Sequence, residues 1–172
     1  ARFFSTFSTF LNGAQPQPGS ISLATQSGAF GSAAYGLATL RGLGFSKIIA
    51  TGNEADVDVA ESIDYLAGDP DTRIICAAVE SCRDGNRLRR ALLKAARAGK
   101  PVLIMKVGRT ELGAAAASTH TGSLAGNDKV YDTVFRECGA LRPESIEEML
   151  DIAYLYTVSG VLPANDELGV FT

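Results

Sequence analysis

The chain has 172 residues, a length that suits one compact domain with a sizeable core rather than two full domains. Its hydrophobic share of 46% and charged share of 20% are ordinary for a soluble domain, and its apolar runs are too interrupted to span a membrane. The formal net charge of -3, without a basic stripe, excludes nucleic-acid binding. Three cysteines without metal or redox spacing predict reduced thiols in a cytoplasmic protein.

Both ends of the chain have the composition of linkers. Residues 1–19 finish in Gln15-Pro16-Gln17-Pro18-Gly19, which cannot continue regular structure. We therefore expect residues 1–19 to lead in from a preceding domain and residues 20–158 to form the domain itself. Residues 159–172 are expected to be a linker and the first strand of a following domain. With no initiator methionine, the chain is expected to be a piece of a longer protein.

Between these ends, short β-branched runs alternate with helical patterns. The predicted strands are Ile21 to Thr25, Lys47 to Thr51, Arg73 to Val79 and Pro101 to Val107. The residues expected to face inward are Phe30, Ala34, Leu37 and Leu40 in the first helix, Val59, Ile63 and Leu66 in the second, Leu88, Leu92 and Ala95 in the third, and Val130, Val134 and Cys138 in the fourth. Ser145 and Glu148 have the spacing of a capping box and open a last helix, expected to end near Val158. This alternation predicts an open doubly wound α/β domain with a parallel sheet, which binds ligands beyond the carboxyl ends of its strands.

The segment after the first predicted strand has the features of a phosphate seat. In Ser27-Gly28-Ala29 a strand runs into a helix whose first turn holds only small residues. Unpaired backbone amides and the positive end of the helix dipole then face outward without obstruction. The alternative is that Ser27 is an ordinary N-cap and Gly28 a tight-turn residue.

His120, the single histidine, lies in Ser118-Thr119-His120-Thr121-Gly122, a stretch with neither helical nor strand periodicity. Neutral imidazole is a good nucleophile near pH 7, and its ring nitrogens accept phosphoryl groups reversibly. The alternative is a surface histidine hydrogen-bonded to its own loop.

Acidic residues follow two of the predicted strands. Glu80 ends an apolar run, at a place where its carboxylate can accept a hydrogen bond from His120, unless it is a solvated residue paired with Arg83. Asn53 begins a group with Glu54 and two aspartates that suggests a metal site, but the helix starting there favours acids that interact with the helix dipole. No metal site is predicted.

Six ordered segments resemble the NDP-forming acyl-CoA synthetases, including ADP-forming acetyl-CoA synthetase, and more distantly the α subunit of succinyl-CoA synthetase. They cover most of residues 20–158 in the order of the family, and together they are a specific match. The segments are Leu23 to Gly31, Thr51 to Ala60, Tyr65 to Thr72, Val79 to Gly85, Lys100 to Arg109 and Ser118 to Gly126.

The resemblance implies a flavodoxin-like fold and a reversible three-step reaction. Phosphate attacks an acyl-CoA thioester, the acyl phosphate phosphorylates a histidine, and the phosphohistidine phosphorylates ADP or GDP. His120 matches the phosphorylated histidine, Glu80 the glutamate that stabilises it, and Ser27-Gly28 the start of the helix that points at the phosphate. Asn53, Arg109, Thr121 and Gly122 are expected to support the substrate or the histidine loop.

The resemblance also implies partners outside this chain. CoA or acyl-CoA, phosphate, and ATP or ADP with Mg²⁺ are the substrates of the whole enzyme, and none is expected to bind this part tightly. A CoA-binding domain and an ATP-grasp domain, in the same or a partner chain, are needed for the full reaction, and the full enzyme is expected to be an oligomer. The acyl substrate and the choice between ADP and GDP are set by those absent parts.

The sequence departs from the family at two places. Thr119 stands before His120 where serine is more common, which keeps a hydroxyl, and Ser81 follows Glu80 where glycine is usual. Two other functions remain as alternatives. One is a non-catalytic domain that senses acyl-CoA or phosphate, or serves as an interaction module, as in synthetase-like protein acetyltransferases, which commonly lack the histidine. The other is a flavin or dinucleotide domain, which would need aromatic residues at the strand ends.

Overall fold

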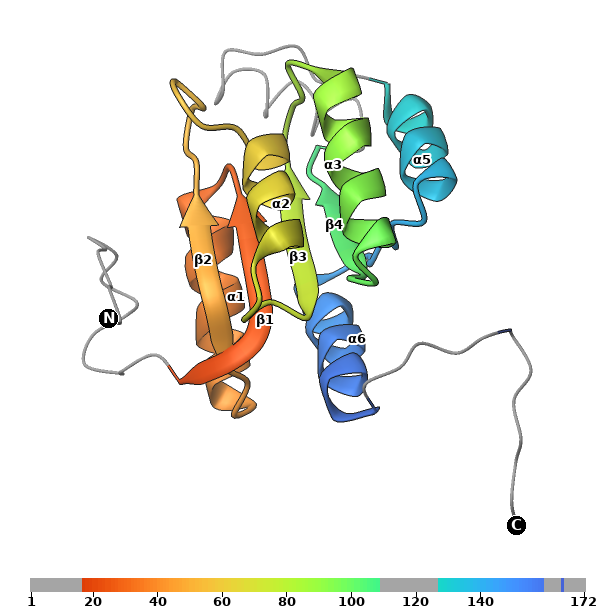
Figure 1. Ribbon diagram of the computed structural model, residues 1–172. Helices are drawn as coiled ribbons and strands as arrows, with labels where there is room; N and C mark the ends of the chain where they lie inside the picture. Colours follow the sequence, from red (N-terminus) through yellow and green to blue (C-terminus); the bar gives the residue numbers. More distant parts are fainter. Residues whose placement is uncertain (1–16, 109–126, 160–164, 166–172) are drawn as a thin grey trace.

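The computed structural model describes residues 17–108, 127–159 and 165. In this part of the chain, four parallel strands form one sheet in the order β2-β1-β3-β4 (Figure 1). The strands are β1 (Pro18–Thr25), β2 (Phe45–Ala50), β3 (Ile74–Val79) and β4 (Val102–Lys106). The helices are α1 (Gly28–Leu40), α2 (Val59–Gly68), α3 (Gly85–Arg97), α5 (Asp128–Glu137) and α6 (Ile146–Ser159). The predicted open α/β fold of the flavodoxin type is confirmed.

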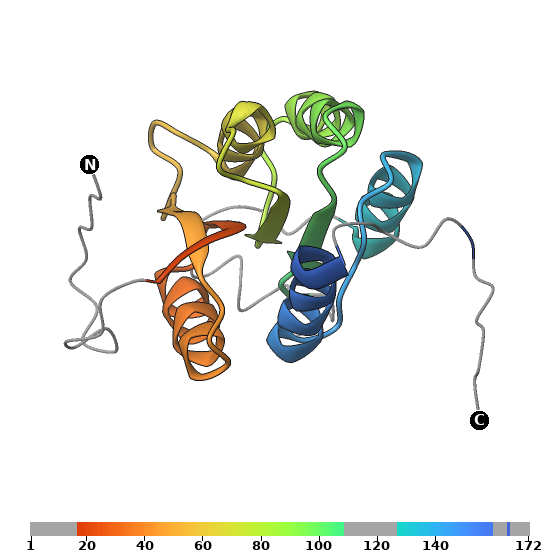
Figure 2. The ribbon, with the colours of Figure 1, turned by 60° about the horizontal axis from the view of Figure 1, so that its bottom comes forward.

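The helices cover both faces of the sheet. Figure 2 shows α2, α3 and α5 on one side and α1 and α6 on the other. The pleat of β3 divides its residues between two cores: Ile75, Ala77 and Val79 face the first group of helices, while Ile74 and Cys76 face the second. A strand buried on both faces reads as a continuous apolar run, which is why β3 was easy to locate from sequence.

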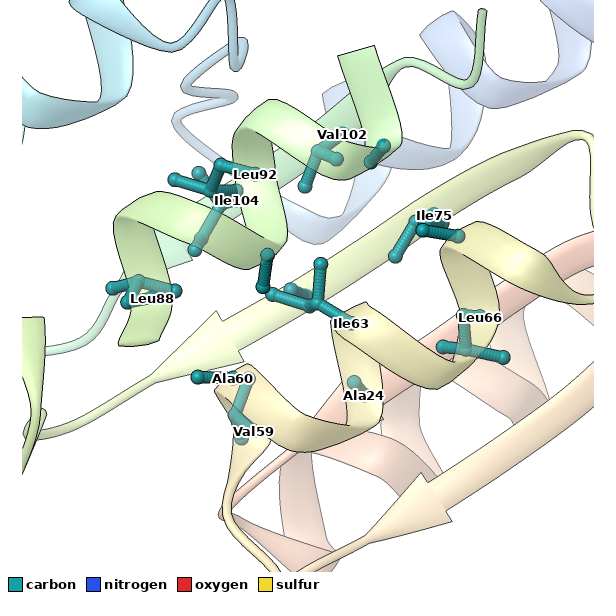
Figure 3. Close-up of a cluster of buried hydrophobic side chains, with 14 of the residues drawn as sticks. Ala24, Val59, Ala60, Ile63, Leu66, Ile75, Leu88, Leu92, Val102 and Ile104 are labelled. Carbon is teal, nitrogen blue, oxygen red and sulfur yellow. The ribbon is translucent and has the colours of Figure 1, made fainter. Parts of the chain in front are cut away.

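The first core is built where α2 and α3 pack on the sheet (Figure 3). Ile63 and Leu66 of α2 and Leu88 and Leu92 of α3 are all at most 3% exposed, as their spacing of three or four residues predicted. Burial of each such side chain contributes about 1.5–3 kcal/mol of hydrophobic free energy. Asp58 caps α2 in a full capping box with Glu61, so the helix starts at Val59.

The predicted inward face of α1 is wrong in part. Leu40 is 86% exposed, and the buried positions of this helix are Gly31, Ala34, Tyr35 and Ala38. Small residues let α1 lie close to the sheet, and a Cβ at Gly31 would already stand 3.2 Å from Cγ2 of Thr25. A hydrophobic pattern that favours large side chains misses a helix face made of glycine and alanine.

Three details at the C-terminal side also differ from expectation. In α5, Val130 is 61% exposed and Phe135 is the fully buried residue. At the start of α6, Ser145 Oγ accepts from the N–H of Glu148, but the Glu148 carboxylate accepts from the N–H of Glu144 instead of closing the box on Ser145. The helix itself extends to Ser159, one residue past the predicted end.

The sheet is longer at two margins than the sequence indicated. β1 begins at Pro18, inside the segment expected to be linker, because Gly19 and Gly44 allow the two backbones to cross closely. Beyond β4, Leu141 forms a parallel bridge with Leu103, which places a single residue in the position of a next strand. Among the described helices, none has the length and apolar character needed to cross a membrane.

Candidate active site

The site lies at the carboxyl ends of β1 and β3, where the chain changes direction across the sheet. From β1 the chain passes through α1 to β2 on one side, and from β2 it returns through α2 on the opposite face to β3 (Figure 2). In doubly wound sheets the crevice at such a switch point is where ligands bind. The residues that emerge there are Gln26 and Ser27 after β1 and Glu80 and Ser81 after β3.

Gln26 fastens these two strand ends together. Its Oε1 accepts hydrogen bonds from the N–H groups of Glu80 and Ser81, and its Nε2 donates to the carbonyl of Ser81 at 3.0 Å. Gln26 and Glu80 are each 6% exposed. The amide therefore fixes the peptide that carries Glu80, a role of Gln26 that the sequence pattern does not predict. Its position directly before Ser27-Gly28 was the only signal.

The first turn of α1 is open toward solvent at the same edge. Ser27 is the N-cap, and its Oγ accepts from the N–H of Phe30 at 3.1 Å. Gly28 and Ala29 are exposed, the first turn contains no acidic residue, and a Cβ at Gly28 would meet nothing within 4 Å. The alternative that Ser27 is an N-cap is therefore confirmed. The same turn can still accept an anion at the positive end of the helix dipole.

Glu80 is buried, which contradicts the alternative of a solvated residue paired with Arg83. The Arg83 guanidinium instead donates to two carbonyls of the loop after β2, those of Asn53 at 3.0 Å and Glu54 at 2.9 Å. Arg83 thereby joins the loops that follow β2 and β3. A buried carboxylate at a strand end suits a hydrogen bond to a ring N–H more than a structural surface pair.

The acidic segment after Asn53 stabilises the chain locally. Glu54 is buried, adopts φ 56°, and its Oε1 accepts from the N–H of Val59 at 2.9 Å. Asp58 is the N-cap of α2. Within the described ranges, no cluster of histidine, cysteine, aspartate and glutamate could hold a metal ion. Asn53 is exposed near this edge, and its support of a substrate stays a prediction.

Lys106 is a second residue that the sequence analysis had not singled out. It ends β4 beside Val79, is only 4% exposed, and its Nζ lies 5.2 Å from the ring centroid of Tyr131. Desolvation lowers its pKa, against the opposing pull of Asp128 and Glu80. A lysine that closes the otherwise apolar strand Val102–Lys106 was the available signal.

Four predicted site residues lie outside the described part of the chain. These are His120, Arg109, Thr121 and Gly122. Their roles stay predictions. Of the predicted site residues that the structure describes, Ser27, Gly28, Ala29 and Glu80 lie together at the carboxyl end of the sheet.

One pocket in the described part of the chain lies away from this edge. A pocket of about 410 Å³ opens near Pro101 and Val102, at the amino end of β4, with Leu92, Cys138 and Tyr156 among its lining residues. It lies at the opposite end of the strand from Lys106, and its lining is mainly apolar. We place the chemistry at the carboxyl edge, where the polar residues converge.

Comparison with known proteins shows the family of the chain. Residues 18–156 match the family described as the succinyl-CoA ligase like flavodoxin domain. The chain belongs to this family. It is 38% identical over 157 residues to an ADP-forming acetate–CoA ligase of Methanocaldococcus jannaschii, covering 91% of this chain and 22% of that protein. It is also 41% identical to subunit alpha of an ADP-forming acetate–CoA ligase of Pyrococcus furiosus, over 79% of this chain and 29% of the relative.

A solved structure extends the comparison to the fold. The acetyl-coenzyme A synthetase 1 of Ca. Korarchaeum cryptofilum, in complex with phosphate and ADP, superposes with a TM-score of 0.68 at 36% identity. The alignment covers 77% of this chain and 29% of that one. The family domain described here thus spans less than a third of these relatives.

Proposed function

We propose that this chain is the phosphohistidine-bearing domain of an ADP-forming acyl-CoA synthetase, an acid–thiol ligase, with His120 as the phosphoryl carrier. The observation that carries the proposal is the buried Glu80, fixed by Gln26 beside the open first turn of α1. Membership in a family whose named relatives are ADP-forming ligases supports a catalytic role over a sensing one.

In the acyl-CoA-consuming direction, an oxygen of inorganic phosphate attacks the thioester carbonyl and CoA leaves as its thiol. A nitrogen of His120 then attacks phosphorus, the P–O bond to the acyl group breaks, and the carboxylate leaves. Finally a β-phosphate oxygen of ADP attacks the same phosphorus, forming ATP and restoring the imidazole. Mg²⁺ enters with the nucleotide as part of the substrate.

The residues of the sheet edge have two roles in this scheme. The first turn of α1, at Ser27, Gly28 and Ala29, receives the phosphate with backbone amides, because the helix dipole favours negative charge there. The carboxylate of Glu80 accepts the N–H of the ring nitrogen that does not react, which fixes the tautomer and stabilises the cationic phosphoimidazole. Arg109, Thr121, Gly122 and Asn53 support the substrate or the loop.

The rest of the reaction belongs to parts outside this chain. A CoA-binding domain supplies the acyl phosphate and an ATP-grasp domain supplies the nucleotide, either in the same polypeptide or in a partner subunit of a cytoplasmic oligomer. CoA, ADP and phosphate are substrates of that whole enzyme. The short share of the relatives that this chain covers supports this division.

The test uses the full-length parent enzyme incubated with ATP and Mg²⁺. The wild type is expected to gain acid-labile, alkali-stable phosphate, and His120→Asn to gain none. Glu80→Gln is expected to lower the yield without lowering Tm, while the exposed control Glu137→Gln leaves both unchanged. Acid-labile phosphate on the His120→Asn enzyme would refute the proposal, and an unchanged yield with Glu80→Gln would make Glu80 a structural residue.

A further inference from the structure

Lys106 and Glu80 lie one register position apart at the carboxyl ends of neighbouring strands. In the register of β3 and β4, Lys106 pairs with Val79, the residue before Glu80. The N–H of Val107 donates to the carbonyl of Val79 at 2.9 Å, so the two peptides that carry these charges are bonded neighbours. Among the described residues, Lys106 is the one buried lysine or arginine.

The surroundings of Lys106 provide little solvation for a charge. Its Nζ donates to the carbonyl of Val107 and faces the ring of Tyr131. The charged groups that act on it are Asp128, Glu80 and Arg142. Arg142 binds Asp128 at 2.7 Å, so that carboxylate has another cation beside it. The charge of Glu80 acts on Lys106 from the neighbouring strand.

This buried charge lowers the stability of the fold. Desolvation lowers the pKa of Lys106, so the folded protein binds this proton less tightly than the unfolded chain does. Protonation of Lys106 therefore destabilises the fold. Stability is greatest above pH 10.5, where the lysine is uncharged in both states, and it is lost as the pH falls through the folded pKa of Lys106. A side chain needed only for packing would be better uncharged at this position. A lysine that is buried at a cost in desolvation indicates that its charge has a role at the candidate site.

We propose that Lys106 is a positioning residue whose fixed ammonium lets the carboxylate of Glu80 and a transferring phosphoryl group share the edge of the sheet. This inference rests on the function proposed above. Two negative groups at one edge of the sheet repel each other, and a cation on the adjacent strand offsets that repulsion. Lys106 forms no bond to the substrate in this role and acts through Glu80.

The first experiment separates function from packing. In the full-length enzyme, Lys106→Met is expected to lower the rate of phosphohistidine formation by about tenfold, a mid-range value for the coupling of neighbouring residues. Its Tm is expected to stay the same or rise, because a desolvated charge is removed. Lys106→Arg keeps the charge and is expected to retain most of the rate. The control Lys94→Met, at an exposed lysine on α3 paired with Asp64, is expected to change neither quantity.

The second experiment asks whether Lys106 acts through Glu80. In a Glu80→Gln background, Lys106→Met is expected to have a threefold effect or less (about 0.6 kcal/mol) on the same rate. An equal effect in both backgrounds, no effect in the wild-type background, or a marked drop in Tm for Lys106→Met would each overturn the proposal. A wild-type enzyme that gains no phosphohistidine would instead refute the proposed function, so the two failures are distinguishable.

Discussion

Gln26 concentrates several buried hydrogen bonds in one side chain at the edge of the sheet. It joins the ends of β1 and β3 through both its oxygen and its nitrogen. A hydrocarbon of the same size would leave two N–H groups and one carbonyl without this partner. Buried groups in that state are costly because they have lost water as well as the protein contact.

We predict that Gln26→Met lowers the free energy of unfolding by about 1–3 kcal/mol, since it leaves buried polar groups unpaired. Chemical denaturation of the purified protein measures this loss. The matched control is Gln17→Met, at an exposed glutamine just before β1, which is expected to change stability by less than about 0.5 kcal/mol. Equal effects at the two positions would contradict the role assigned to Gln26.

Asp69 gives the fold a defined pH dependence. Its carboxylate accepts from Lys47 Nζ at 2.7 Å and from Thr72 Oγ1 at 2.5 Å. Burial alone would raise the pKa of Asp69, but the bonds from Lys47 and Thr72 hold it below its ordinary value of 3.8. Since the folded pKa is the lower one, this stability is present above about pH 4 and is lost as the pH falls further.

We therefore predict that Asp69→Asn lowers stability at neutral pH by about 1–3 kcal/mol and flattens its loss below pH 4, because the titrating group is gone. Thermal unfolding measured between pH 2 and pH 7 checks both effects, and the midpoint of the acid loss is expected within about one pH unit of pH 4. Asp71→Asn is the control, because Asp71 meets the same lysine at 3.4 Å but its side chain is 75% exposed. If Asp71→Asn flattened the curve as much as Asp69→Asn, burial would not be the cause.

Only part of the site could be predicted residue by residue. Glu80 directly follows an apolar run and Ser27 lies two residues after the first predicted strand, so strand patterning was enough to place them at one edge. Gln26 and Lys106 were missed because their roles depend on which strands are neighbours, and sequence order does not reveal that β3 lies between β1 and β4. The pattern also does not distinguish a buried lysine from one whose charged end reaches water.

At the scale of the elements, the ends of the strands were predictable to within one to three residues, while the buried faces of the helices were less so. Periodicity located α2 and α3 with their correct inward residues because both use large aliphatic side chains. In α1 it was correct for Ala34 but wrong for Leu40, which is exposed, and it missed the buried Gly31. Close approach of a helix to a sheet selects small residues, which carry no hydrophobic signal.

The residue before β2 must also be small, because another part of the backbone passes close to it. A Cβ on Gly44 would lie 2.4 Å from the carbonyl oxygen of Pro18, a backbone atom that cannot yield easily. We predict that Gly44→Ala lowers the free energy of unfolding by about 1–3 kcal/mol through this overlap. Gly36→Ala within α1, where nothing lies within 4 Å of the added carbon, is expected to raise it by up to about 1 kcal/mol. Chemical denaturation of the two variants in parallel tests these two expected changes. A Gly44→Ala variant that is more stable than the wild type would refute the first of them.

At the scale of the whole molecule, the fold class followed from the alternation of strands and helices alone. The order β2-β1-β3-β4 did not, because several parallel orders satisfy the same alternation. The family segments also divide by place in this fold. Those around Ser27 and Glu80 lie at the carboxyl edge, whereas the one around Asp69 lies at the amino end of β3 and stabilises a turn. Resemblance to a family therefore marks structural positions as readily as chemical ones.

The bonds made by Gln26 have a mechanical consequence. Since this amide holds the peptides of Glu80 and Ser81 against the residue before α1, the carboxylate and the anion-accepting helix end cannot separate without breaking buried hydrogen bonds. Under the proposed function, we expect this edge of the sheet to stay rigid during turnover. If a phosphoryl group travels from a CoA site to a nucleotide site, the travelling must be done by other parts of the protein, while this edge stays in place for each arrival.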